Sequence, residues 1–280
     1  MKTIKIGIIG FGTIGSGLVK ALEEKRAVLR ERAGVDIEIA AICDKDLRSR
    51  RPVKVDKKIL TKSVGKVIYD PEIDIVVELI GGVHPAKEII SQAMMEGKHV
   101  VTANKALLSE AGHEIFGLAN RLGLSVGFEA SVAGGVPIIR ALKESFVANR
   151  IDLIYGIING TSNFILTKMA EGGSSFKEAL KIAQEKGYAE RDPYLDISGG
   201  DSAHKLSILA LLGFGVPVNS KNIYTEGITD IEPSDIEYAA NQGYAIKLLA
   251  IAKRSGNLLE LRVHPTLIPK GDLLADVRGI

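Results

Sequence analysis

The first half of the chain alternates short apolar runs with longer segments whose apolar residues recur at helical spacing. The isoleucine-rich run Ile4–Ile9 is typical of a strand that is buried on both faces. Strands that alternate with helices predict βαβ units and a parallel sheet, and hence an α/β fold. The pattern predicts further strands over 37–43, 73–80, 99–102 and 125–128, and helices over 14–32, 85–96 and 107–122, with Gly34 ending the first helix.

The second half has a different rhythm, which predicts a separate α+β domain. Residues 245–253 and 258–268 flank the turn signal Arg254-Ser255-Gly256-Asn257, so we expect them to pair as a hairpin, although 245–253 also has a helical interpretation. We place the boundary at residue 130, which gives domains over 1–130 and 131–280. Within the second domain the pattern predicts helices over 138–146, 164–171, 176–186 and 200–212, and a strand over 151–158.

The composition excludes several classes of protein. Of 280 residues, 46% are hydrophobic and 25% are charged, which excludes intrinsic disorder. A net charge of +2 is too small for a nucleic-acid coat or a polybasic membrane anchor, and no apolar run reaches the roughly 18 residues of a membrane-spanning helix. The only cysteine, Cys43, excludes an intrachain disulfide and fits a reducing compartment. We therefore expect a cytoplasmic protein with no nucleic-acid or membrane partner.

A glycine motif follows the first predicted strand. Gly10-Phe11-Gly12-Thr13-Ile14-Gly15 matches the G-x-G-x-x-G fingerprint of dinucleotide-binding Rossmann domains. In that fingerprint the first glycine permits a tight turn, the second lets the backbone approach a pyrophosphate, and the third lets helix and strand pack closely. Because the motif lies between a strand and a helix N-terminus, which attracts phosphate, we expect it to bind NAD or NADP.

The residues after the second strand leave the choice between NAD and NADP open. Asp44 stands where an acidic side chain would bond the ribose 2′-hydroxyl of NAD. Lys45, Arg48, Arg50 and Arg51 follow at once, and they could hold the 2′-phosphate of NADP or form a solvated basic loop. Asp44 and Arg48 are therefore candidate cofactor ligands, and we expect both cofactors to be used.

Two lysines are candidates for the chemical site. Thr102 and Lys105 lie at and just beyond the end of the strand 99–102, and ligands of open parallel sheets bind beyond the carboxyl ends of the strands. Asp201 and Lys205 lie four residues apart on a predicted helix, so they share one face. A charged pair on so apolar a helix is costly unless it serves a function. Such a lysine can protonate the alkoxide formed when a carbonyl is reduced.

An acidic segment, which we expect to be a loop, precedes that helix. It carries Glu190 and Asp196, whose carboxylates could bind an ammonium group of a substrate.

The residues around these candidates resemble the homoserine dehydrogenase family. Its signature is matched at every defined position by Ala183-x3-Gly187-Tyr188-Ala189-x2-Asp192-Pro193-x2-Asp196-Ile197-x-Gly199-x-Asp201-x3-Lys205. Three further segments are similar to that family, and the likeness runs from residue 4 to about 270. They are Thr102-Ala103-Asn104-Lys105, Glu129-Ala130-Ser131-Val132-Ala133-Gly134-Gly135-Val136-Pro137 and Asn159-Gly160-Thr161-Ser162-Asn163-Phe164.

The resemblance implies a Rossmann domain, then an α+β domain that binds substrate and forms a homodimer. It also implies the reversible NAD(P)H-dependent reduction of L-aspartate 4-semialdehyde to L-homoserine, in threonine, methionine and isoleucine biosynthesis. Lys205 and Lys105 would act at the reacting oxygen with Asp201 beside it, and Glu190 and Asp196 would hold the amino-acid end. Glu129, Val132, Gly134 and Val136 would bind a monovalent cation, sodium or potassium, mainly through backbone carbonyls.

The length of the chain departs from the family pattern. Many members carry a C-terminal regulatory domain that senses threonine, and members continue for some tens of residues beyond the position of Ile280. The apolar residues Leu273, Leu274 and Val277 have no evident partner in the sequence. We therefore expect a truncated form that is destabilised or poorly active, mainly through weakened cofactor affinity. A natural short form is the alternative.

Two other classes of protein share parts of this pattern. Aspartate-semialdehyde dehydrogenase has a similar layout but needs a nucleophilic cysteine in its second half, whereas Cys43 lies in the first and is expected to be a small buried hydrophobe. A non-catalytic dinucleotide sensor would fit the fold, but it would not need Lys105, Glu190, Asp201 and Lys205 together.

Overall fold

The computed structural model describes residues 1–280 and divides the chain into two compact units, Met1–Pro137 and Ile138–Ile280. Each unit has its own sheet and its own apolar core. No helix in either unit combines the length and the apolar character needed to cross a membrane.

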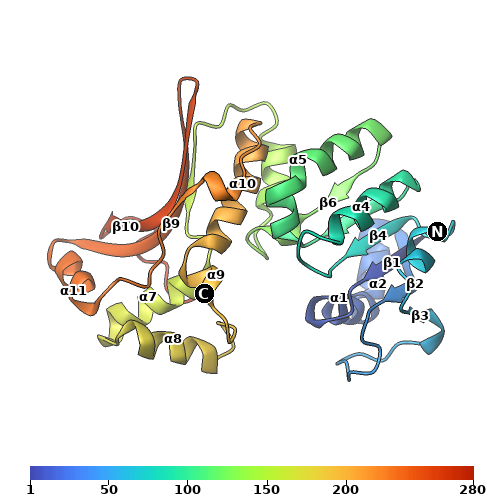
Figure 1. The fold of residues 1–280 in the computed structure, drawn as a ribbon, viewed down its shortest axis with the longest axis horizontal. Coiled ribbons are helices and arrows are strands. Elements are labelled where there is room, and N and C mark those ends of the chain that lie inside the picture. The colour runs from blue at the N-terminus through green and yellow to red at the C-terminus, as the bar shows by residue number, and fades with distance from the viewer. The chain divides into compact units, whose positions relative to one another are not determined.

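The first unit is built on a six-stranded parallel sheet with the order β3-β2-β1-β4-β5-β6 (Figure 1). The strand order reverses direction between β1 and β4, which is the Rossmann arrangement. The predicted α/β fold is thus confirmed. The strands are β1 (Lys2–Ile9), β2 (Val35–Cys43), β3 (Leu60–Thr61), β4 (Ile75–Glu78), β5 (His99–Thr102) and β6 (Val126–Gly127).

Helices cover both faces of this sheet. Figure 1 shows α1 and α2 on one face and α4 and α5 on the other, as right-handed crossovers in opposite directions require. The single helix expected up to Arg32 is instead two helices that meet at Lys25, because the apolar stripe ends with α1 and α2 buries no residue. Gly34 ends α2 with φ +68°, as predicted. The helices are α1 (Thr13–Glu24), α2 (Arg26–Ala33), α3 (Gly65–Ile68), α4 (Ala86–Met95) and α5 (Lys105–Leu122), with 3₁₀ turns at Lys57–Ile59 and Glu129–Ser131.

The second unit is an α+β structure around a mixed sheet with the order β7-β9-β10-β8. The hairpin is confirmed: β9 and β10 pair antiparallel from Tyr244↔Pro269 to Ser255↔Leu258, so the helical interpretation of 245–253 was wrong. Buried residues occur consecutively along β9 because both of its faces are covered. One face packs against helices of this unit, and the other contacts Ile268 and Leu274. The strands are β7 (Leu153–Gly156), β8 (Tyr224–Thr225), β9 (Tyr244–Ser255) and β10 (Leu258–Pro269).

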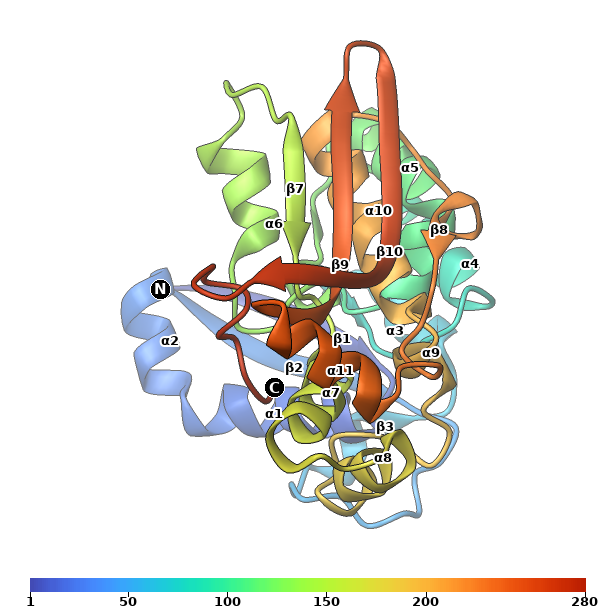
Figure 2. The same ribbon diagram turned by 90° about the vertical axis from the view of Figure 1, so that its left-hand side faces the viewer.

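The helices of this unit pack on one face of the sheet. In Figure 2, α10 lies behind β9 and β10, and the opposite face of these strands is turned to the viewer. The predicted helix 138–146 is one short α-helical turn that continues as a π-helix, and α9 and α11 were not predicted. The helices are α6 (Ile138–Arg140) with the π-helix Ala141–Ser145, α7 (Gly160–Gly172), α8 (Phe176–Glu185), α9 (Tyr194–Ile197), α10 (Gly200–Phe214) and α11 (Pro233–Asn241), with a 3₁₀ turn at Ser220–Asn222.

The segment 274–280 packs on its own unit. Leu274, which had no evident partner in the sequence, contacts the apolar cluster of β9 and β10, whereas Leu273 is exposed. The amide of Asn163 on α7 donates to the Gly279 carbonyl at 2.9 Å, and the buried ammonium of Lys247 donates to Asn163 and to the Val277 carbonyl. Burial, followed by the nearby guanidinium of Arg278, lowers the pKa of Lys247.

Candidate functional site

The glycine motif forms the turn between β1 and α1 with the geometry that phosphate binding requires. Gly10 has φ +106°, where a side chain would be strained, and its N–H donates to the Cys43 carbonyl at 2.8 Å. A Cβ at Gly15 would lie 2.1 Å from the Gly10 carbonyl oxygen, so this residue must be glycine for helix and strand to pack. A Cβ at Gly12 would meet no atom within 4 Å. Open space therefore lies beside the N-terminus of α1, where a pyrophosphate would bind.

The other residues of the motif divide between core and surface. The Phe11 side chain is buried in the core beside β1, and its N–H donates to Asp44 Oδ2 at 2.5 Å. Thr13 is exposed, and Ile14 is 62% exposed. Ile14 is thus available to a ligand at the helix N-terminus.

Asp44 lies directly after β2, where an acid for the ribose was expected. Its Oδ1 also accepts from the Asp46 N–H at 2.7 Å, and Arg51 Nη2 lies 4.0 Å from the same oxygen. Each carboxylate oxygen has two lone pairs, so these contacts hold the side chain in place and leave acceptor sites for ribose hydroxyls.

The basic loop after Asp44 is ordered by Asp46. The Ser49 hydroxyl and the N–H groups of Arg48 and Ser49 lower the pKa of Asp46 to about 2, so this side chain remains a fixed anion at neutral pH. Arg51 lies 5.7 Å from the centre of the Phe11 ring and donates to the Asp46 carbonyl. Arg48 and Arg50 are exposed. Arg51 therefore supports the loop, whereas Arg48 and Arg50 project from it.

Lys105 is the first residue of α5, at the carboxyl end of the parallel sheet. The Asn104 side chain caps this helix by accepting from the Leu107 N–H, and its amide donates to the Gly82 carbonyl at 2.6 Å. The buried carboxylate of Glu78, at the end of β4, accepts from the Thr102 hydroxyl at 2.7 Å and from the N–H groups of Ile80 and Gly81. The hydroxyl of Thr102 is thus engaged within the protein, and this network fixes the start of α5.

In the second unit, the structure brings Asp196, Asp201 and Lys205 together. Lys205 Nζ lies 2.6 Å from Asp201 Oδ2 on the same face of α10, as the spacing predicted, and it donates to the Ile158 carbonyl at 2.8 Å. Asp201 is 4% exposed and the Lys205 side chain 18%. Asn159 Nδ2 donates to Asp196 Oδ1 at 2.7 Å and to Asp201 Oδ2 at 2.9 Å. The loop before α7, the short helix α9 and the long helix α10 therefore meet at the Asn159 amide, next to the Lys205–Asp201 pair.

Sequence reasoning assigned no role to Asn159 or to the Ile158 carbonyl. Asparagine before a helix is a capping signal, and Asn159 caps α7 by accepting from the Ser162 N–H. The helix was predicted to begin at Phe164, whereas α7 begins at Gly160, so Asn159 was not recognised as its capping residue. The contacts to α9 and α10 span 37 to 47 residues, and no local pattern encodes them.

Glu190 does not join this cluster. It lies in the exposed loop before α9, and its backbone carbonyl, not its carboxylate, accepts from Gln184 Nε2 at 3.2 Å. Its carboxylate is open to solvent and accessible to a ligand.

The segment with Glu129, Val132, Gly134 and Val136 is an irregular turn of the first unit. It begins with a 3₁₀ turn, and the backbone is left-handed at Ala133 and Gly135, with φ +50° and +90°. Val132 is fully buried, whereas Gly134 and Val136 are exposed. The structure contains no group of three or more acidic, histidine or cysteine side chains suited to a metal ion.

Cys43 has the properties of a core residue. It is 3% exposed at the end of β2, and burial, followed by the charge of Asp44, raises the pKa of its thiol. A buried thiol with a raised pKa is a poor nucleophile, which argues against the thioester-forming alternative.

Comparisons with known proteins agree with these observations. The family model described as "Homoserine dehydrogenase, NAD binding domain" matches residues 10–129, and the model described as "Homoserine dehydrogenase" matches residues 137–280. The chain is 48% identical over 280 residues to homoserine dehydrogenase from Neisseria gonorrhoeae. That alignment covers all of this chain and 64% of the relative, so the chain spans less than two thirds of the length of that protein.

Solved structures give the same result. A homoserine dehydrogenase from Thiobacillus denitrificans superposes with a TM-score of 0.92 at 49% identity, covering 100% of this chain and 64% of that one. A hyperthermophilic archaeal homoserine dehydrogenase in complex with NADPH superposes with a TM-score of 0.82 at 26% identity, covering 99% of this chain and 86% of that one. With both units matched, the resemblance drawn from the sequence is confirmed, and the chain belongs to the homoserine dehydrogenase family.

Proposed function

We propose that this protein is an NAD(P)-dependent homoserine dehydrogenase, which reduces L-aspartate 4-semialdehyde to L-homoserine and catalyses the reverse oxidation. The observation that carries the proposal is the Lys205 ammonium, held on a largely buried helix by Asp201 and the Ile158 carbonyl. Family membership supplies the reaction. The setting would be cytoplasmic threonine, methionine and isoleucine biosynthesis.

In this proposal the two fixed contacts of Lys205 leave one donor for the substrate. An ammonium group has three N–H donors, and here two are directed at protein oxygens. We assign the third to the carbonyl oxygen of the semialdehyde. When bound, NAD(P)H supplies the hydride to the carbonyl carbon. Lys205 then gives a proton to the oxygen as it becomes a hydroxyl, with Lys105 acting at the same oxygen.

The amino-acid end of the substrate is assigned to Glu190 and Asp196. The Glu190 carboxylate is exposed, and Asp196 uses only one carboxylate oxygen for Asn159. Both can therefore accept hydrogen bonds from an ammonium group. We also propose a sodium or potassium site at Glu129, Val132, Gly134 and Val136. Two left-handed residues turn this backbone sharply, which suits a hard cation that takes oxygen ligands.

A spectrophotometric assay tests the proposed reaction. Purified protein is mixed with L-homoserine and NAD or NADP, and formation of the reduced nicotinamide is followed. We expect reduction that depends on L-homoserine and is not supported by L-threonine or L-serine. Dinucleotide binding without turnover would instead indicate a sensor, the alternative that has the same fold.

We propose that the cofactor site is lined by Gly10, Phe11, Gly12, Thr13, Ile14, Gly15, Asp44, Arg48, Thr102 and Lys105.

The exposed arginines of the basic loop allow a test of cofactor choice. Replacing Arg48 and Arg50 with alanine is expected to raise KM for NADP about 10-fold and to leave KM for NAD within 2-fold, because only NADP carries a 2′-phosphate. Steady-state kinetics with both cofactors measure this. Equal losses would remove the pair from 2′-phosphate binding, and Arg32→Ala on α2 serves as an exposed arginine control.

A homodimer through the sheet of the second unit is also proposed. The face opposite α10 carries Leu153 and Tyr155 on β7, which are 48% and 53% exposed. Residues that pair across neighbouring strands point to the same face of a sheet. Tyr155 on β7 pairs with Ile251 on β9, Ile251 pairs with Arg262 on β10, and Arg262 pairs with Tyr224 on β8. Tyr155 and Tyr224 therefore share this face. Exposed aromatic and aliphatic side chains on one sheet face are typical of protein–protein contacts, and a two-fold dimer is the commonest closed assembly.

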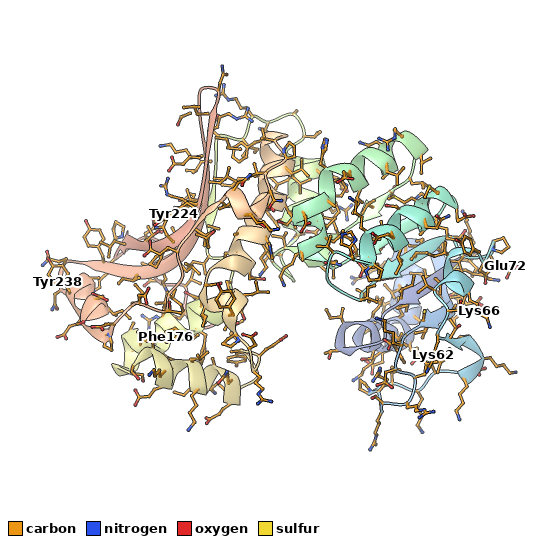
Figure 3. The ribbon with its side chains drawn as sticks, in the orientation of Figure 1. Lys62, Lys66, Glu72, Phe176, Tyr224 and Tyr238 are labelled. Atoms are coloured by element: carbon orange, nitrogen blue, oxygen red, sulfur yellow. The ribbon has the colours of Figure 1, made fainter.

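Charge placed on this face should disrupt the dimer. Tyr155→Asp is expected to change the mass in solution from that of two chains to that of one at micromolar concentration, measured by light scattering. Tyr238, which projects from α11 in Figure 3 and is 70% exposed, provides the matched control Tyr238→Asp, which should stay dimeric. A wild-type protein with the mass of one chain would contradict the proposal.

A further inference from the structure

We propose that Asn159 is a positioning residue that holds Asp196 and Asp201 in separate roles through the two N–H donors of one amide group. This inference rests on the proposed function. It assigns to Asn159 a task that neither of its neighbours can perform, because the acceptor and both donors of its side chain are engaged at once.

Asp196 and Asp201 carry like charges close to each other. Asp196 and Asp201 both accept from the same nitrogen, so two carboxylates face each other at short range in a partly buried site. Like charges at this separation repel, and each is costly to bury without donors. A neutral group with two donors satisfies both carboxylates and adds no third charge. A lysine here would compete with Lys205 for Asp201, and an aspartate would add to the repulsion.

The two carboxylates have different hydrogen-bond partners. Asp201 Oδ2 accepts from both Asn159 Nδ2 and Lys205 Nζ, so its orientation fixes the ammonium group. Asp196 has no lysine partner and retains an oxygen for a substrate ammonium. Without Asn159, Asp196 would be free to turn toward Lys205. The amide therefore keeps one carboxylate for the catalytic lysine and the other for the substrate.

The amide group of Asn159 is held rigidly. Asn159 is 5% exposed, and its Oδ1 accepts from the Ser162 N–H at 2.8 Å. Ser162 in turn donates from its hydroxyl to the Asp196 carbonyl at 2.8 Å, and the residue before Asn159 supplies the carbonyl that binds Lys205. The amide cannot rotate without breaking the cap of α7, so its two N–H groups point in fixed directions.

Two substitutions separate the donor role from the capping role. Asn159→Asp is nearly isosteric and keeps the capping oxygen, but it removes the donors and adds a charge. Asn159→Ser keeps a capping oxygen and adds no charge. We expect kcat/KM for homoserine to fall about 10-fold or more in Asn159→Ser and further in Asn159→Asp, with both kcat and KM affected. KM for NAD(P) should stay within 2-fold, because the nucleotide residues belong to the first unit.

The matched control is Ser175→Ala. Ser175 caps α8 in the same unit and contacts none of these residues, so its loss should lower the melting temperature while kcat and KM stay near the wild-type values. If Asn159→Ser retains wild-type kcat and KM, or if Ser175→Ala changes them equally, the positioning role is refuted.

A double-mutant cycle tests the contact without any assay of turnover. Melting temperatures are compared for Asn159→Ser, Asp196→Ala and the double variant, with Ser175→Ala and Asp196→Ala as the control cycle. We expect the first pair to be non-additive and the control pair to be additive. Additivity in the first pair would overturn the inference. If the wild-type protein shows no homoserine-dependent turnover, the proposed function fails, and the cycle alone decides whether Asn159 couples to Asp196.

Discussion

Replacing Lys205 with alanine is expected to lower kcat about 100-fold or more while leaving cofactor affinity unchanged. The fold-change is the lower end of what general acid–base catalysis contributes. In the proposed reaction, Lys205 supplies the proton to the oxygen of the semialdehyde, and its ammonium group is held in place by Asp201 and the Ile158 carbonyl. NAD(P) binding, followed by nicotinamide fluorescence, should be preserved because the phosphate loop lies in the first unit.

Controls must separate lost chemistry from lost folding. Removing one partner of a buried ion pair leaves an uncompensated charge at Asp201, which can cost several kcal/mol. Lys205→Ala combined with Asp201→Asn removes the stranded charge, so this double variant should melt close to the wild type and remain inactive. Lys205→Met keeps the apolar stem of the side chain, so it separates lost packing from the lost ammonium group, and it should be as inactive as Lys205→Ala. Lys168→Ala, which removes a half-buried lysine of α7 that pairs with Glu171, should retain full turnover. Turnover within 2-fold of the wild type in Lys205→Ala would remove this residue from the mechanism.

Gly12, Gly15 and Gly17 lie close together in the chain, and replacing each with alanine should give a different result. Gly12→Ala is expected to fold normally and to weaken NAD(P) binding at least 10-fold. Its Cβ meets no protein atom within 4 Å and the backbone φ of −75° is ordinary, so the methyl group can clash only with a ligand. Gly15→Ala should instead destabilise the fold, because its Cβ would lie 2.1 Å from the Gly10 carbonyl oxygen. Overpacking of this kind typically costs 1–3 kcal/mol or more.

Gly17→Ala is the control for both. Gly17 is exposed within α1, and its Cβ would meet nothing within 4 Å, so alanine should raise stability by about 0.5–1 kcal/mol through helix propensity and leave NAD(P) binding intact. Thermal melts and cofactor titrations of the three variants measure these effects. If Gly12→Ala binds NAD(P) as tightly as the wild type does, the pyrophosphate does not pass over this turn.

The elements that could be predicted are those encoded locally. The strand His99–Thr102 has the predicted bounds, and the position of Asp201 and Lys205 on one face follows from helical spacing alone. The hairpin of β9 and β10 was signalled by its turn at Gly256, which has φ +61°. In each case the information lies within a few residues of the feature.

The features that escaped prediction depend on contacts between distant segments. β3 and β8 are two-residue strands that exist because a neighbouring strand accepts them, at Ile42↔Leu60 and Arg262↔Tyr224. The α9 turn lies in a segment that the acidic composition marked as a loop. The role of Asn159 requires α9 and α10 to fold back onto the start of α7, which no periodicity reveals.

The burial of Cys43 has a consequence for measurement. It is the only thiol in the chain, it is closed to solvent, and its own carbonyl accepts the N–H of Gly10, the first glycine of the nucleotide turn. A thiol reagent can therefore react only when this part of the sheet opens, and the labelling rate reports the free energy of that local opening. A bound dinucleotide stabilises the closed form, so it slows labelling in proportion to its occupancy. The chain thus carries an intrinsic chemical probe of cofactor binding that needs no substrate and no catalysis.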